Sequence, residues 1–170
     1  MMKLTLLVVL VTLISLPVVA GETVVLGPYT LSFDAHQMGT TTLQYDDPYA
    51  TEYDTLYSCV LWKRTPEKVC AIYLHDGLEP YAPEFLNDTL DLWLGYGTVR
   101  VKTWNDSEDG IIAYRGEGIT EERALQAYGY SKAFNTTQDG SGVNMFIVTK
   151  TVGLTKNEAD VIFNSMKLVV

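Results

Sequence analysis

The sequence has few of the residues that usually carry catalysis or metal binding. It holds two cysteines and two histidines in 170 residues. The histidines, His36 and His75, have no metal-ligand spacing to each other or to a cysteine. No phosphate-binding glycine loop, nucleophile elbow or dinucleotide fingerprint occurs. These absences predict a protein with no cofactor, no bound metal and no catalytic centre.

Basic residues are also scarce. Lysine and arginine total 12 against 21 aspartates and glutamates, which gives a formal net charge of −9. A chain this acidic repels nucleic-acid phosphates and anionic lipid surfaces. Beyond the N-terminus, no apolar run approaches the roughly 20 residues that a membrane-spanning helix needs. The composition therefore excludes nucleic acid as a partner and leaves the N-terminus as the one candidate membrane segment.

The first twenty residues have the layout of a secretory signal peptide. Met1–Lys3 is a short basic start, residues 4–16 are almost purely aliphatic, and Val18–Ala20 offers small residues for cleavage. We expect the segment 1–20 to be removed. The protein would then work outside the cytoplasm, either secreted or at the cell surface.

Cleavage would leave residues 21–170 as a single domain. These 150 residues are a common domain size, and no linker or repeat divides them. Because the removed segment holds Lys3 and no acid, the formal net charge would fall from −9 to −10. In the alternative, an uncleaved segment 1–20 tethers the domain to the membrane, although Pro17 interrupts the apolar run.

The two cysteines, Cys59 and Cys70, form an even pair in an exported chain. Such pairs are more often bonded than free. Residues 57–64 and 68–75 have the composition of two strands joined by a tight turn. We therefore predict a disulfide between Cys59 and Cys70.

The register of this hairpin decides whether the bond can form. A turn centred on Arg64 and Thr65 places the two cysteines directly opposite each other. A turn centred on Pro66 and Glu67 offsets them by four residues, too far apart for a bond. The residues alone leave both registers open.

Three Asn-x-Ser/Thr sequons begin at Asn87, Asn105 and Asn135. Each is a candidate N-glycosylation site in a compartment that performs this modification. Asn105 and Asn135 also lie in polar stretches typical of turns, so ordinary turn chemistry is an alternative interpretation of both.

Hydrophobic patterning predicts strands along most of the chain and helices at two places. Residues 83–94 carry an apolar stripe opposite an acidic face, which indicates a helix, although residues 90–94 also alternate as in a strand. Residues 125–134 alternate small with large side chains, which predicts a strand whose small face admits a helix or another backbone. Residues 143–152 are apolar on both faces, as in a central strand. Thr155 and Glu158 form a capping box that begins a final helix.

Strands at hairpin spacing combined with two helices predict an α+β fold. The ending, residues 145–149 followed by a helix over 157–168, resembles that of PsbP-like domains. Residues 27–34 and 109–113 are similar to those of a group of uncharacterised exported archaeal proteins. The resemblance implies a central antiparallel sheet flanked by helices, closing with a strand and then a C-terminal helix. It also implies a non-catalytic accessory or interaction role.

A tyrosine-rich acidic segment is the best candidate site. Tyr45, Tyr49 and Tyr53 lie among acids that include Asp46 and Asp47. Tyrosines stack on sugars or become buried at interfaces, and carboxylates orient hydroxyls or bind hard cations. The segment predicts contact with an envelope protein or a glycan, with cation binding as a further alternative. The structural alternative is an edge strand with its loop.

A small secreted hydrolase is the least favoured function. Glu117, Glu121 and Glu122 could in principle pair as glycosidase carboxylates, but the sequence does not give their separation. Ser131 and Lys132 are adjacent, and strand alternation would place their side chains on opposite faces. We therefore expect an exported interaction module without chemistry of its own.

Overall fold

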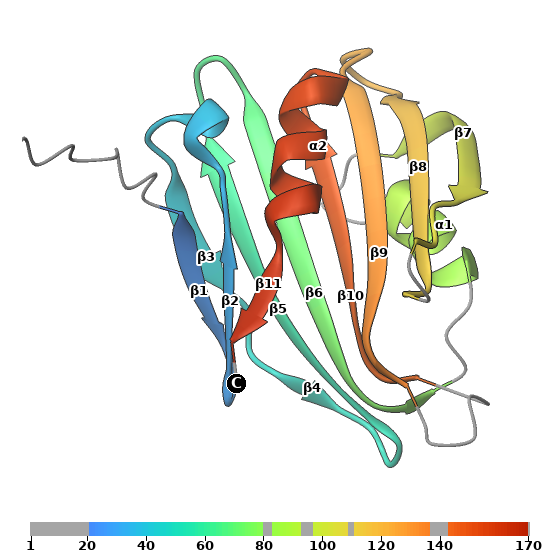
Figure 1. Cartoon of the computed structure of the whole chain (residues 1–170). Helices are drawn as coiled ribbons and strands as arrows, with labels where there is room; N and C mark the ends of the chain where they lie inside the picture. Colours follow the sequence, from blue (N-terminus) through green and yellow to red (C-terminus); the bar gives the residue numbers. More distant parts are fainter. Residues whose placement is uncertain (1–20, 80–82, 93–96, 109–110, 137–142, 170) are drawn as a thin grey trace, which may run out of the picture.

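The computed structural model describes residues 21–79, 83–92, 97–108, 111–136 and 143–169. These residues form two antiparallel sheets, two α-helices and a short 3-10 turn (Figure 1). The expected signal segment, 1–20, lies outside the described residues, so its cleavage stays a prediction. The elements in chain order are β1 Glu22–Leu26, β2 Tyr29–Phe33, η1 His36–Met38, β3 Thr42–Tyr45, β4 Tyr49–Ala50, β5 Asp54–Lys63, β6 Lys68–Glu79, α1 Pro83–Leu92, β7 Thr98–Asn105, β8 Ala113–Thr120, β9 Gln126–Thr136, β10 Val143–Val152, α2 Lys156–Ser165 and β11 Lys167–Val169.

The fold is predominantly β, and the predicted α+β class is wrong. Strand accounts for 59% of the structure, so the sheets rather than the helices define the architecture. The chain also does not end in a helix. The helix expected over 157–168 stops at Ser165, where Met166 turns extended, and Lys167–Val169 forms the strand β11. The strands outweigh the helices because β5, β6, β9 and β10 each run for 10 to 12 residues.

The larger sheet has the strand order β3-β5-β6-β10-β9-β8-β7, and β4 also pairs with β5. Strand β10 is central, as predicted from its apolar residues on both faces. Phe146 and Ile147, which point to opposite faces, are both fully buried. Central placement explains this pattern, because each face of the strand needs its own apolar cover.

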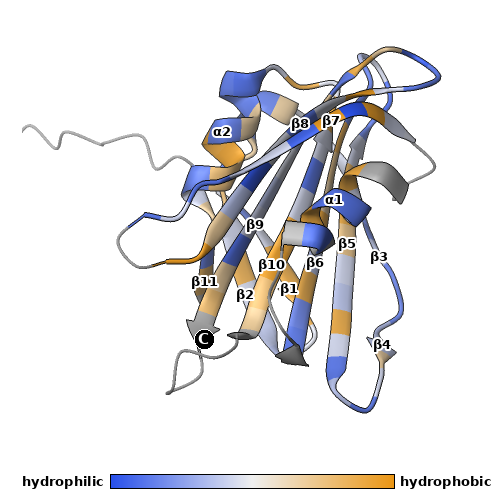
Figure 2. Cartoon of the chain, turned by 90° about the vertical axis from the view of Figure 1, so that its right-hand side faces the viewer, coloured by the Kyte–Doolittle hydropathy of each residue, from blue (hydrophilic) through white to orange (hydrophobic). Residues whose placement is uncertain are grey.

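One face of the large sheet is covered by α2 and the small sheet β1-β2-β11; we call it the α2 face (Figure 2). The β1–β2 hairpin contributes Leu31 and Phe33, and the sheet contributes Ile72 and Ile147. An isolated hairpin is marginally stable in water. Pairing of β11 with β2 and burial against the larger sheet give this hairpin its stability.

Helix α1 covers the opposite face, which we call the α1 face. Its Leu86 and Leu90 are fully buried above small residues of β8 and β9. A Cβ at Gly129 would lie 2.6 Å from Leu86 Cδ1, and one at Gly116 would lie 2.5 Å from Leu90 Cδ1. The small residues therefore admit the helix, which confirms the prediction for the strand over 125–134.

A lysine is buried beneath α1. Lys150 is fully buried on β10, and its Nζ donates a hydrogen bond of 2.7 Å to the carbonyl oxygen of Leu90. That carbonyl lies in the last turn of the helix, where a positive charge is favoured by unpaired carbonyls and by the helix dipole. Lys150 thus fixes the C-terminal end of α1 to the centre of the sheet.

Helix α2 begins as its sequence predicts. Thr155 accepts a hydrogen bond from the backbone N–H of Glu158, and the Glu158 side chain accepts one from the backbone N–H of Thr155. Ile162 and Phe163 are buried against the sheet, which confirms the expected orientation of the helix. Phe163 stacks on Tyr130 of β9, with 5.1 Å between the ring centroids.

We predict that Glu158 makes the stability of the protein depend on pH below 5. Lys68 donates to its carboxylate at 2.9 Å, and together with the Thr155 backbone N–H it lowers the pKa of Glu158 from about 4.5 to about 2. A carboxyl whose pKa is lowered on folding stabilises the fold above its unfolded pKa, and this stabilisation is lost as the pH falls from about 5 toward 2. In denaturant melts, Glu158→Gln should make the loss of stability over this range shallower. The same change at exposed Glu122 should leave the range unaltered, and equal acid profiles for wild type and Glu158→Gln would contradict the prediction.

The cysteine hairpin has a register between the two that were expected. Residues 64–67 form the turn, Cys59 lies opposite Ile72, and Cys70 lies opposite Leu61. The cysteines are therefore diagonal neighbours, farther apart than directly opposed residues. Both are buried free thiols, and burial raises the pKa of Cys59 to about 12.

The disulfide stays a prediction, and this register does not favour it, because a bond requires close approach of the two Cβ atoms. Peptide mapping of the unreduced protein tests it. The expected product of a bonded hairpin is the 59–70 link, and two thiols that become alkylated only after unfolding would refute the bond.

Candidate functional site

The three candidate tyrosines lie along one margin of the large sheet, and we call them the tyrosine edge. Tyr45 is on β3, Tyr49 is on β4, and Tyr53 is in the bend between β4 and β5. Their exposures are 47%, 67% and 64%. Tyr57, the next tyrosine along the chain, is instead partly buried against the small sheet. The edge-strand placement that sequence analysis gave as the structural alternative is therefore what the structure shows, and it leaves all three rings accessible.

Tyr45 also connects the two sheets. Its hydroxyl accepts a hydrogen bond of 3.2 Å from the backbone N–H of Val25 on β1. Tyr45 and Asp46 line a small cleft of about 160 Å³ with Tyr57 and Ser58 and with residues of the β1–β2 hairpin. Tyr49 and Tyr53 do not line this cleft. The structure thus brings Tyr45 together with Asp46, and leaves the other two tyrosines on the open surface of the β4–β5 segment.

The acidic residues of the segment are exposed beside the tyrosines. Asp46, Asp47 and Glu52 all lie at the surface. Asp46 accepts a hydrogen bond of 2.9 Å from the Ser58 hydroxyl, which fixes the start of the β3–β4 connection. Within the described ranges, no three His, Cys, Asp or Glu side chains are grouped to hold a metal ion. The acids therefore give the tyrosine edge a negative border.

The residues considered for hydrolysis are dispersed. Glu117 is in the middle of β8, whereas Glu121 and Glu122 are exposed in the turn that follows it. Ser131 is fully buried on the α1 face, and Lys132 points to the α2 face. The structure does not bring these groups to a common site.

Two of the sequon asparagines are exposed. Asn87 lies on the surface of α1, and Asn105 ends β7, where its side-chain oxygen accepts a hydrogen bond of 2.8 Å from the backbone N–H of Ser107. This contact is the turn chemistry expected of Asn105. Asn135 is near the end of β9, and its side chain is outside the described part. Glycosylation at all three stays a prediction.

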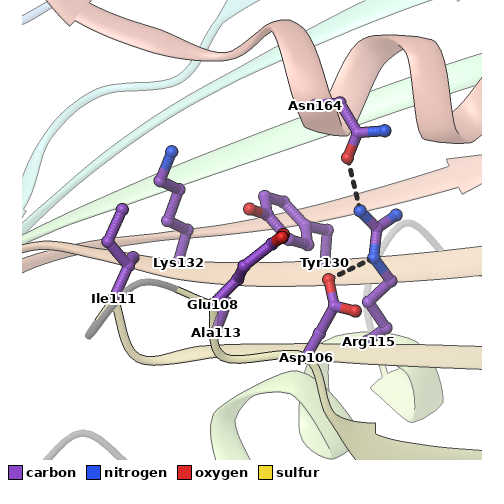
Figure 3. A pocket seen from close by; sticks show the side chains of 8 residues that line it. All are labelled: Asp106, Glu108, Ile111, Ala113, Arg115, Tyr130, Lys132 and Asn164. Carbon is purple, nitrogen blue, oxygen red and sulfur yellow. Dashed lines mark hydrogen bonds and ion pairs between the residues drawn. The ribbon is translucent and has the colours of Figure 1, made fainter.

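A polar cavity that sequence analysis missed lies on the α2 face. It has a volume of about 460 Å³. The lining side chains come from the β7–β8 connection, β8, β9 and α2 (Figure 3): Asp106, Glu108, Ile111, Ala113, Arg115, Tyr130, Lys132 and Asn164. The cavity arises because Ala113 is small and lies directly opposite Lys132 in the sheet. Finding it from sequence would have required the β8–β9 register, which the residue pattern does not give.

Arg115 organises one wall of this cavity. Its guanidinium donates to Asp106 at 2.5 Å, to Asp160 at 2.7 Å and to Asn164 at 2.6 Å. It also lies 4.9 Å from the centroid of the Tyr130 ring. Since two of the three acceptors lie on α2, Arg115 binds the helix to the sheet, and all three of its nitrogens are engaged.

The remaining polar groups of the cavity are not engaged with one another. Lys132 Nζ lies 5.7 Å above the Phe134 ring, and it forms no ion pair with any described residue. Glu108 likewise has no ion-pair partner in the described part of the chain. Burial raises the pKa of Tyr130, so its hydroxyl stays protonated at neutral pH.

No protein-family model, curated protein or solved structure matches the chain. The resemblance to PsbP-like domains is therefore supported by no relative. None of the described helices has the length and hydrophobicity needed to cross a membrane.

Proposed function

We propose that the protein is an exported, non-catalytic interaction module that binds an envelope partner through the tyrosine edge. The observation that carries the proposal is the exposure of Tyr45, Tyr49 and Tyr53 on adjoining elements of one sheet margin. Large aromatic side chains that are exposed together at a surface often mark a binding site, and such residues dominate the energy of protein interfaces.

The backbone at this margin supports the same function. Strand β3 pairs with β5 on one side and with no other described strand on its outer side. An open strand edge carries unpaired N–H and C=O groups, to which an extended segment of a partner can add. The tyrosine side chains would then provide specificity beside a backbone interaction that is not sequence-specific.

The charge of the margin indicates the partner's chemistry. Asp46, Asp47 and Glu52 border the tyrosines, and the whole chain is acidic. Lysine or arginine side chains of a partner would pair with these carboxylates and pack over the aromatic rings. We therefore propose a protein partner that presents an extended, basic segment, and we expect binding to weaken as salt rises.

The test is capture of the partner from the native envelope by immobilised protein comprising residues 21–170. Recovery should fall at least about thirtyfold when Tyr45, Tyr49 and Tyr53 are all changed to alanine, since loss of aromatic anchors at an interface costs about 2 kcal/mol or more. The matched control is Trp62→Ala, because Trp62 is an exposed aromatic residue of β5 outside the tyrosine edge.

The outcomes distinguish the binding surface, the class of partner and the absence of catalysis. Unchanged recovery with the triple variant, with folding verified by circular dichroism, would exclude the tyrosine edge. Recovery that survives protease treatment of the extract but not removal of glycans would replace the protein partner with a glycan. Hydrolase activity of the purified domain above background, abolished by changing Glu117 or Ser131, would contradict the non-catalytic role.

A further inference from the structure

We propose that the cavity on the α2 face is a binding site for a small zwitterion of the α-amino-acid type. The cavity lies apart from the tyrosine edge, because its residues come from the β7–β8 connection, β8, β9 and α2. Its volume of about 460 Å³ is in the range of small-molecule sites.

The site presents one cation and one anion that are not paired with each other. Lys132 and Glu108 both line the cavity, yet they form no ion pair with one another or with any other described residue. A ligand that carries both a positive and a negative group can pair with Glu108 and Lys132 at the same time. The ammonium group of an amino acid would face Glu108, and its carboxylate would face Lys132.

The hydroxyl of Tyr130 offers a second donor at the same carboxylate position. Tyr130 is 6% exposed, lines the cavity beside Lys132 and donates to no described residue (Figure 3). A protonated hydroxyl on a largely buried side chain gains by donating to an acceptor. With Lys132 two residues along the same strand face, Tyr130 provides a second donor for a carboxylate.

The other charges of the cavity exclude ions of a single sign. Asp106 lines the cavity and is paired with Arg115. With Glu108 and Lys132, the charged lining carries two negative and two positive groups. A simple anion would be repelled by the carboxylates, and a simple cation would leave Lys132 and the Tyr130 hydroxyl without partners. A zwitterion can pair with Glu108 through its cationic group and with Lys132 and the Tyr130 hydroxyl through its anionic group.

A sugar fits the site less well. Carbohydrates are usually held by stacking on an open aromatic face. The ring of Tyr130 already stacks on Phe163 and lies against the guanidinium of Arg115. The Tyr130 ring is thus already engaged on one face and beside its edge, which favours polar recognition through its hydroxyl.

The test is a ¹H–¹⁵N NMR titration of residues 21–170 with each of the common L-amino acids. At least one should bind saturably and shift amides of residues 111–115 and 130–132. Its N-acetyl derivative, which lacks the ammonium charge, and its C-terminal amide, which lacks the carboxylate, should each bind at least tenfold more weakly.

Two variants and two controls complete the experiment. Lys132→Gln and Glu108→Gln should each weaken binding at least tenfold, and the spectra report directly whether the variants are folded. Lys102→Gln on β7 and Glu84→Gln on α1 make the same charge changes at exposed positions outside the cavity, and they should bind as wild type. The proposal is overturned if no amino acid saturates below 20 mM, if either derivative binds as tightly as the parent, or if the control variants lose as much affinity as the cavity variants.

Discussion

Phe163→Ala should reduce the free energy of unfolding by about 3–5 kcal/mol, as expected for a large aromatic side chain removed from a core. Phe163 is 2% exposed and stacks on Tyr130, so its removal leaves a cavity between α2 and the sheet. It also removes one of the two rings that the Arg115 guanidinium contacts. Urea melts followed by circular dichroism measure the change.

The matched control is Val161→Ala on the same helix. Val161 is 38% exposed, and an exposed substitution of this kind should change stability by no more than about 0.5 kcal/mol. A loss below 1 kcal/mol for Phe163→Ala would mean that α2 is peripheral to the core and would contradict the fold as described.

Gly153→Ala should cost about 3 kcal/mol or more. Gly153 connects β10 to α2 with a φ of 75°, and left-handed backbone costs an alanine roughly 1–2 kcal/mol. In addition, a Cβ at this position would lie 2.1 Å from the backbone oxygen of Glu67, which cannot rotate away as a side chain can. Overpacking of this kind typically adds about 1–3 kcal/mol.

Gly153→Asn separates the two causes in the same melts. Asparagine tolerates positive φ better than alanine, but it carries the same Cβ. We expect the asparagine variant to remain strongly destabilised, because the overlap with Glu67 persists. Full recovery of stability in Gly153→Asn would show that backbone conformation alone is responsible, and wild-type stability in both variants would contradict the close approach.

The sequence predicted the elements of the fold better than their assembly. Local signals were sufficient for the 57–75 hairpin, for the capping box at Thr155 and for the small-residue face over 125–134. Assembly depends on contacts between distant segments, such as the pairing of β11 with β2 near the opposite end of the chain. A three-residue strand has too short a pattern to predict, so the chain was expected to end in a helix. The fold class was wrong for another reason, since the long strands β5, β6, β9 and β10 outweigh the two helices.

The candidate sites also divide into one that local sequence predicted and one that depends on contacts between distant segments. Composition alone selected the tyrosine edge, since aromatic and acidic residues adjoin in one short segment. The cavity was missed because its residues lie in three separate stretches of chain, from Asp106 to Asn164. Its chemistry becomes visible only when the register pairs Ala113 with Lys132 and Arg115 with Tyr130. Buried Lys150 was missed for the same reason, because its partner is a carbonyl of α1.

The most direct test of the proposed function is site-specific photo-crosslinking in the native host. A photoreactive phenylalanine analogue replaces Tyr49 or Tyr53 in the full chain, and Trp62 in a control. Illumination should join positions 49 and 53 to one and the same envelope protein, whose linked peptide is extended and basic, and position 62 should give no such product. Absence of any adduct from 49 and 53, or an equal yield of the same adduct from 62, would contradict binding through the tyrosine edge.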